Sequence, residues 1–207
     1  MNAIMSSPET LYAALLSSLD LLPNALLVVD DGGRVLHANH AGTLAVQNGR
    51  TVMIRDGAVR MVSAIHADLL REALYGAREP ICIRIPHPPG KPCTILMVPL
   101  DNGYGAGGPA LLVFIGDPEI TREPDAALLA RLFGFTVAQA KVAALLMQGK
   151  TVVEVAAVLS ITEHTARNHL KRLFFKTRTK KQVELVHVLM SSPAALLVSF
   201  DKYRRRT

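Results

Sequence analysis

Three short motifs of the form T-x-x-E/Q, all within residues 136–182, constrain this chain more than any other feature. They are Thr136 with Gln139, Thr151 with Glu154, and Thr179 with Gln182. In such a capping box the threonine hydroxyl accepts from a backbone N–H three residues on, while the Glu or Gln side chain reaches back. The spacing predicts four short helices of about ten residues each, joined by short turns, with a left-handed Gly149 just past the first.

The third of these helices, expected over residues 163–176 after a cap at Thr162, has two faces of opposite character. On a helical wheel its apolar side chains share one stripe, which we expect to pack on the two preceding helices through Val142, Leu145, Val155 and Leu159. The stripe consists of Ala166, Leu170, Leu173 and Phe174. The opposite face carries His164, Arg167, Asn168, Lys171 and Arg172, and only Glu163 lies nearby to balance the charge.

A basic helical face by itself is equally consistent with a solvated surface. Here the preceding helix, a short turn over residues 160–162 and the basic helix form a helix-turn-helix, whose second helix is the one that enters a DNA major groove. This context favours double-stranded DNA as the partner.

The segment 136–186 resembles the LuxR-type helix-turn-helix domain of bacterial transcription regulators. The matching positions are Thr136, Val142, Leu145, Gly149, Thr151, Glu154, Ala156, Leu159, Ile161, Thr165, Arg167, His169, Leu170, Phe174, Lys176, Glu184 and Leu185. The resemblance implies DNA binding, for which the candidate residues are His164, Thr165, Arg167, Asn168, His169, Lys171, Arg172, Lys176 and Thr151. Gln139 and Lys141 depart from the family, which usually has acidic residues there. Ser160 and Arg178 stand where the family favours glycine, so we expect strain at both and less than maximal stability.

The last expected helix, over residues 180–190, carries an apolar stripe that one small domain need not bury. Its members are Val183, Val186, Leu189 and Met190. The family resemblance makes this a dimer helix, which predicts a homodimer on a roughly palindromic site.

The N-terminal half predicts an antiparallel sheet with helices on a single face. Strands are expected over 25–29, 34–38, 81–85, 93–100 and 110–115, and helices over 1–22, 40–48 and 66–76. The polar turn at Asp30–Gly33 indicates a hairpin, because a parallel crossover needs a dozen or more residues. With the opening stretch Ser18–Asn39, this order resembles the PAS sensor fold. The fold class is therefore α+β: a PAS-like sheet domain followed by an all-α, four-helix LuxR-type domain.

The side chains assigned by alternation to the inside of the sheet are nearly all aliphatic. They are Leu27, Val29, Leu36, Ile83, Ile95, Met97, Leu112 and Phe114. A cofactor site usually adds several placed polar groups to its apolar wall, so we expect no absorbing cofactor, and either a filled core or a small apolar ligand. The helical stripe Leu11, Leu15, Leu19 and Leu22 is expected to pack on its own domain or on a partner subunit.

Three other signals point to different functions. His66 is a conceivable haem ligand, although a lone histidine is more often an ordinary packed residue. Gly103, Gly105 and Gly108 satisfy G-x-G-x-x-G, but a strand follows them instead of the helix that a phosphate site requires. Asp30 and Asp31 resemble the metal-binding acids of a phospho-receiver, the main alternative for this half, although Asp56 comes too early to be its acceptor.

Charge divides the chain at the same place as the motifs. Residues 1–124 hold 9 Lys or Arg against 12 Asp or Glu, and residues 125–207 hold 14 against 5. We therefore expect a sensor or dimerisation domain over 1–117, a linker over 118–125, a DNA-binding domain over 126–191 and a basic tail over 192–207. An alternative is a signalling protein whose basic domain binds a protein partner.

Several classes of protein are not favoured. A secretory signal begins with positive charge, and no Lys or Arg precedes Arg34. No apolar run reaches the roughly 20 residues of a spanning helix. We therefore expect a cytoplasmic protein with no membrane partner. Cys82 and Cys93 are expected to be free thiols, with no metal site. No catalytic motif is present, so we expect no enzymatic activity.

Overall fold

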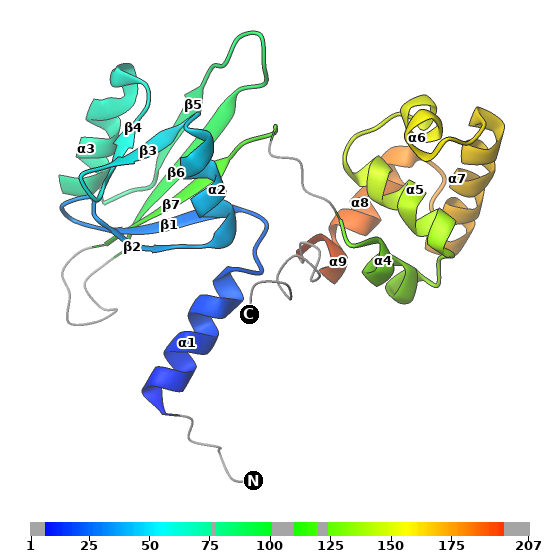
Figure 1. Ribbon diagram of the computed structural model, residues 1–207, viewed down its shortest axis with the longest axis horizontal. Helices are drawn as coiled ribbons and strands as arrows, with labels where there is room; N and C mark the ends of the chain where they lie inside the picture. The colour runs from blue at the N-terminus through cyan, green and yellow to red at the C-terminus, as the bar shows by residue number, and fades with distance from the viewer. Residues whose placement is uncertain (1–6, 76–77, 101–109, 120–123, 197–207) are drawn as a thin grey trace. The chain divides into compact units, whose positions relative to one another are not determined.

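The computed structural model describes residues 7–75, 78–100, 110–119 and 124–196. The chain forms two compact units, Met1–Ile120 and Thr121–Thr207 (Figure 1). The Gly-rich loop with Gly103, Gly105 and Gly108, and the basic residues after Leu196, lie outside the described residues.

The first unit is built on one antiparallel sheet of five strands in the order β2-β1-β7-β6-β5. These strands are β1 (Ala25–Asp30), β2 (Val35–Ala38), β5 (Ile81–Ile85), β6 (Cys93–Leu100) and β7 (Ala110–Gly116). β1 and β2 form the expected hairpin, and every pairing in the sheet is antiparallel. The expected antiparallel sheet is confirmed, and the receiver alternative is wrong because that fold needs a parallel sheet.

One face of the sheet is covered by α2 (His40–Asn48), α3 (Ala67–Tyr75) and a separate hairpin of β3 (Val52–Arg55) and β4 (Ala58–Met61) (Figure 1). Their buried side chains, such as Ala45, Val59 and Leu70, share one core with Leu27 and Met97 of the sheet. This hairpin was not predicted from the sequence. The helix expected from residue 66 begins one residue later as α3, and His66 ends a separate 3-10 turn, η1 (Ala64–His66).

The inward set assigned by alternation is correct for β1, β5 and β6 but wrong for two other strands. Leu36 is 60% exposed, and in β7 the buried side chains are Leu111, Val113 and Ile115. Leu112 and Phe114 therefore point to the opposite face, because neighbouring residues of a strand alternate.

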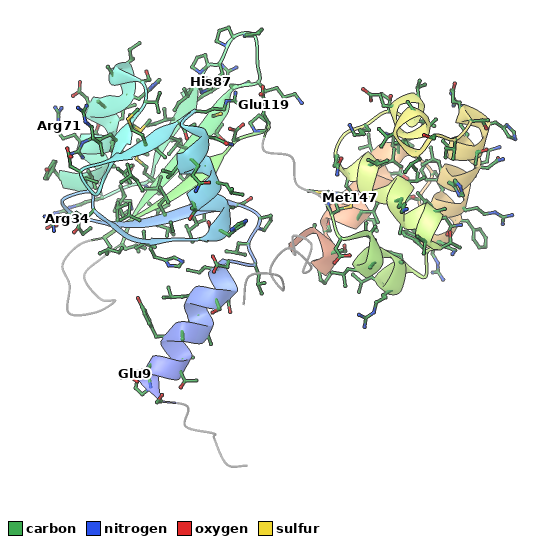
Figure 2. The ribbon with its side chains drawn as sticks, viewed as in Figure 1. Glu9, Arg34, Arg71, His87, Glu119 and Met147 are labelled. Atoms are coloured by element: carbon green, nitrogen blue, oxygen red, sulfur yellow. The ribbon has the colours of Figure 1, made fainter. Side chains whose placement is uncertain are left out.

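α1 (Pro8–Leu19) begins at a Ser7 cap and buries none of its residues. Leu11 and Leu15 are 57% and 56% exposed, and the side chains of the helix stand clear of the sheet (Figure 2). Packing on its own domain is therefore not observed for Leu11 and Leu15, whereas Leu19 and Leu22, at the other end of the stripe, are half-buried.

The second unit consists of helices around one apolar core. They are α4 (Ala126–Phe133), α5 (Val137–Met147), α6 (Val152–Leu159), α7 (Glu163–Thr177), α8 (Gln182–Met190) and α9 (Pro193–Leu196). Leu129, Val142, Leu173 and Leu189 are fully buried in this core or nearly so. α9 was not predicted from the sequence, and its Ala194 is buried in this core as well.

None of the described helices is long and apolar enough by itself to cross a membrane. The pair α4 and α5 reaches the required length and composition only when taken together, and it bends by 114° between them.

Candidate nucleic-acid interface

Two capping boxes fix where α5 and α6 begin, as expected. The Thr136 hydroxyl accepts from the Gln139 backbone N–H at 3.3 Å, and Gln139 Oε1 accepts in return from the Thr136 N–H at 3.0 Å. Thr151 and Glu154 repeat this arrangement at 3.3 and 2.7 Å. These bonds satisfy N–H groups that have no partner inside the helix.

The third capping box, predicted for Thr179 and Gln182, does not form, and this prediction is wrong. α8 begins later, at Gln182, and the Glu184 carboxylate accepts from the backbone N–H groups of Lys180 and Lys181 at 2.8 and 3.3 Å. The Thr179 hydroxyl instead lies 2.9 Å from the Thr177 hydroxyl, because the left-handed Arg178 turns the chain before Thr179.

The turn between α6 and α7 is short and depends on an unusual backbone conformation. Ser160 ends α6 with φ 53° and ψ 43°, in the left-handed region, and Arg178 ends α7 in the same way. Both are the positions where strain was expected. The Thr162 hydroxyl then accepts from the Thr165 N–H at 3.1 Å and starts α7, so that α6 and α7 form a helix-turn-helix.

α7 separates its apolar and basic side chains as its sequence requires. Ala166 and Leu173 are fully buried, and Leu170 and Phe174 pack partly against the same core. The exposed side chains include His164, Arg167, Asn168, Lys171 and Arg172, together with Phe175, which is 82% exposed, while Thr165 and His169 are half-buried. The structure thus brings three candidate cations and an amide together on one side of a rigid helix, together with His164.

Lys176, Thr151 and Thr165, three of the candidate DNA-binding residues, form side-chain hydrogen bonds within the domain, and the Thr165 hydroxyl lies 2.8 Å from that of Thr162. The Lys176 ammonium donates to the Gly134 carbonyl and, at 3.0 Å, to Gln139 Oε1, which ties the end of α7 to the junction of α4 and α5. The Thr151 hydroxyl donates to Glu154 Oε2 at 2.8 Å. The Thr151 backbone N–H, and after it this hydroxyl, hold the pKa of Glu154 below its usual value, so the box is formed at neutral pH.

An ion pair on the basic face was not predicted. Glu163 Oε1 accepts from Arg167 Nε at 3.1 Å and also from Nη2. The signal was present in the sequence, since an acid four residues before a base lies on the same helical face.

Residues 135–189, from just before α5 to α8, match the family model described as "Bacterial regulatory proteins, luxR family". They form a LuxR-type domain. The resemblance seen in the sequence is confirmed for this part of the chain, and the family consists of DNA-binding regulators, not enzymes. No curated protein sequence matches the chain.

Some solved structures are similar over most of the chain at low identity. The phage VqmA–DPO complex shares 17% identity with a TM-score of 0.36, covering 94% of this chain and 95% of that one. The Vibrio cholera VqmA–ligand–DNA complex shares 20% with a TM-score of 0.35, covering 89% and 92%. The PAS domain of Bordetella pertussis BvgS shares 20% with a TM-score of 0.36, covering 59% and 94%. Likeness at this level says nothing of what this chain binds.

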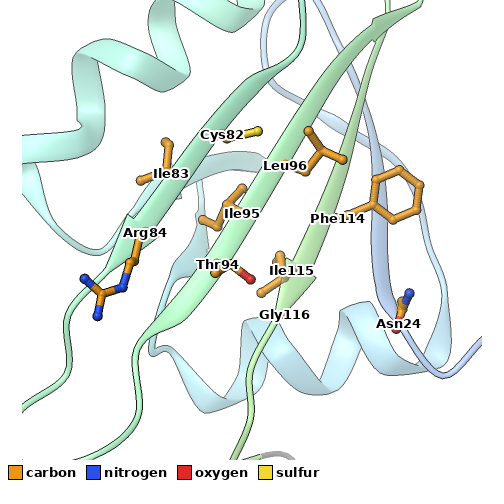
Figure 3. A pocket seen from close by; sticks show the side chains of 10 residues that line it. All are labelled: Asn24, Cys82, Ile83, Arg84, Thr94, Ile95, Leu96, Phe114, Ile115 and Gly116. Carbon is orange, nitrogen blue, oxygen red and sulfur yellow. The ribbon is translucent and has the colours of Figure 1, made fainter. Parts of the chain in front are cut away.

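The first unit has a concavity of about 510 Å³ on the face of the sheet opposite the core (Figure 3). Cys82, Thr94, Leu96 and Phe114 contribute side chains to it from β5, β6 and β7. Within the described residues no group of three or more His, Cys, Asp or Glu is placed to hold a metal ion.

Proposed function

We propose that this protein is a sequence-specific, DNA-binding transcription regulator. The proposal is carried by α7, whose basic face lies opposite a buried apolar stripe in a LuxR-type domain. In a helix-turn-helix the N-terminal part of the second helix meets base edges in the major groove. The DNA-binding residues of the proposal are His164, Thr165, Arg167, Asn168, His169, Lys171, Arg172, Lys176 and Thr151.

The chemistry of these side chains suits two kinds of contact. Arginine and lysine pair with guanine O6 and N7, and asparagine pairs with adenine, so Arg167, Asn168 and Lys171 are assigned to bases. Thr151 stands at the N-terminus of α6, where the helix dipole and the other free backbone N–H groups favour a phosphate, while its own N–H and hydroxyl donate to Glu154. The Lys176 ammonium has a third hydrogen beyond its two internal bonds, which suits a phosphate as well.

The regulator acts as a homodimer in this proposal. Val183 is 80% exposed and Met190 is 48% exposed on α8, with Val186 half-buried beside them. Leu189, by contrast, lies in the domain's own core and drops out of the expected dimer stripe. Sedimentation at micromolar concentration should give two copies, and a monomer with and without DNA would contradict the dimer.

The unit before the linker serves as the sensor or dimerisation domain. We assign 1–117 to it, 118–125 to the linker, 126–191 to DNA binding and 192–207 to a basic tail, the first part of which, α9, packs on the core of the DNA-binding unit. The core of the sensor unit is filled by aliphatic side chains, and the concavity on the other face of its sheet is open and largely apolar. This composition suits a small apolar ligand or a dimer contact more than haem or flavin.

Selection of bound sites from random DNA duplexes tests the proposal. We expect the full chain to enrich one roughly palindromic sequence, whose half-site spacing reports the dimer. Binding should weaken as salt rises, because phosphate contacts release counterions. Failure to enrich any sequence, together with binding to a protein partner, would favour the signalling alternative.

A further inference from the structure

Glu163 is the only carboxylate in α7, all of which the structure describes. It stands at the first position of the helix, next to the side chains assigned to DNA. A carboxylate there repels phosphates, so it lowers the attraction of this face for DNA in general. Its contacts suggest what it contributes in return.

The carboxylate holds Arg167 by one edge of the guanidinium group. Nε donates to Glu163 Oε1 at 3.1 Å, and Nη2 donates to the same oxygen. Both side chains remain substantially exposed, at 61% for Arg167 and 46% for Glu163. A guanidinium group has five N–H donors, and three of them, on Nη1 and Nη2, have no partner in the described part of the chain.

We propose that Glu163 is a positioning residue that presents Arg167 to a guanine and so sets specificity at one base pair. The inference rests on the proposed function. With the Nε edge occupied, the end of the group formed by Nη1 and Nη2 stays free, and two parallel N–H donors match guanine O6 and N7. An unrestrained arginine can turn to a phosphate or to another base instead, whereas a held one has fewer such choices.

The pair is too exposed to contribute much to folding, because water and salt screen such ion pairs. Its consequence is therefore expected in discrimination between DNA sequences. Removing the carboxylate should relax the preference for guanine and strengthen binding to unrelated DNA, because the freed arginine reaches phosphates and one repulsive charge is lost.

The test uses the full chain and the duplex obtained by site selection, with each base pair substituted in turn. Glu163→Gln keeps the shape and removes the charge, and Arg167→Ala removes the reading group. Glu72→Gln, an exposed residue of α3 in the other unit, is the matched control for net charge. Thermal unfolding of every variant is recorded alongside the dissociation constants.

We expect Arg167→Ala to lose about tenfold or more of the discrimination at one base pair, the size of one bidentate contact. Glu163→Gln should lose roughly fivefold at the same pair and bind random duplexes about twofold to threefold more tightly, with little change in unfolding temperature. Glu72→Gln should change neither quantity.

Two outcomes would overturn the proposal while leaving the proposed function intact. One is full discrimination in Glu163→Gln at the pair that Arg167→Ala relaxes. The other is a loss at a different pair, which would mean that Glu163 reads a base itself. A chain that shows no preferred duplex at all would overturn the proposed function, and this inference with it.

Discussion

Asn39 joins four segments of the sensor unit, and its replacement should destabilise that unit strongly. The side chain is fully buried. Its Nδ2 donates to the carbonyls of Leu19 and Asn24 at 3.0 and 2.9 Å, and its Oδ1 accepts from the N–H groups of Leu26 and Gly42 at 2.9 and 2.7 Å. It thus connects the end of α1, the following loop, β1 and the first turn of α2.

Each of these bonds contributes about 1 kcal/mol net, and a buried group left without a partner costs about 1–3 kcal/mol. Asn39→Ala removes all four bonds and leaves the buried Leu26 N–H without its acceptor. We therefore expect the free energy of unfolding of the sensor unit to fall by about 4 kcal/mol, which is a large part of the stability of an ordinary domain.

Hydrogen exchange measured by mass spectrometry in increasing urea follows the two units separately in the full chain. Peptides from residues 25–38 and 110–116 should report the loss, whereas peptides from α5 to α8 should not. Asn48→Ala, an exposed asparagine in the last turn of α2, is the control and should change stability by less than about 0.5 kcal/mol. A loss below about 1 kcal/mol for Asn39→Ala would refute the reasoning.

The remaining predictions concern strain, thiols and cofactors. Ser160→Gly should stabilise the DNA-binding unit by about 0.5–1 kcal/mol in the same exchange experiment, because glycine adopts φ 53° without strain. Ser191→Gly, at φ −82°, should not stabilise it, and an equal gain would contradict the strain argument. Alkylation of the native protein at neutral pH should modify the exposed Cys82 alone, because Cys93 is buried and its burial, then the Asp117 carboxylate, raise its pKa. Rapid labelling of Cys93 would show that this core opens. The purified protein should show no visible absorption band, and a stoichiometric flavin or haem retained through gel filtration would prove this expectation wrong.

The helical unit was predictable from sequence because its signals are local. α7 begins where it was expected and ends one residue later, because caps and helical periodicity act within a few residues. The third box failed for a reason that is also local but less visible. A left-handed Arg178 delays the next helix, and a different acid, Glu184, then caps it.

The sheet was less predictable because pairing decides its details. β7 is apolar at almost every position, so alternation cannot choose its inner face, and its register against β1 and β6 settles the choice. The β3–β4 hairpin did have a signal. Asp56 and Gly57 form its two-residue turn, both with positive φ, and an Asp-Gly pair between short apolar runs is typical of such hairpins.

The candidate interface was predicted in its composition but not in its internal contacts. The helical wheel placed Arg167, Asn168 and Lys171 correctly on the exposed side. It could not show that Lys176 bonds to Gly134 and Gln139, because that contact joins residues about forty positions apart.

Binding of the selected duplex by α7 variants tests the central claim most directly. Arg167→Ala and Lys171→Ala are compared with Lys141→Ala, an exposed lysine of α5 outside the basic face, over a series of salt concentrations. Each α7 variant should lose about 1–3 kcal/mol of binding free energy if the side chain meets a base, or should lower the salt slope by about one if it meets a phosphate. The control should bind nearly as the unmodified protein does. Unchanged affinity and slope in both folded α7 variants would contradict the assignment of this face to DNA.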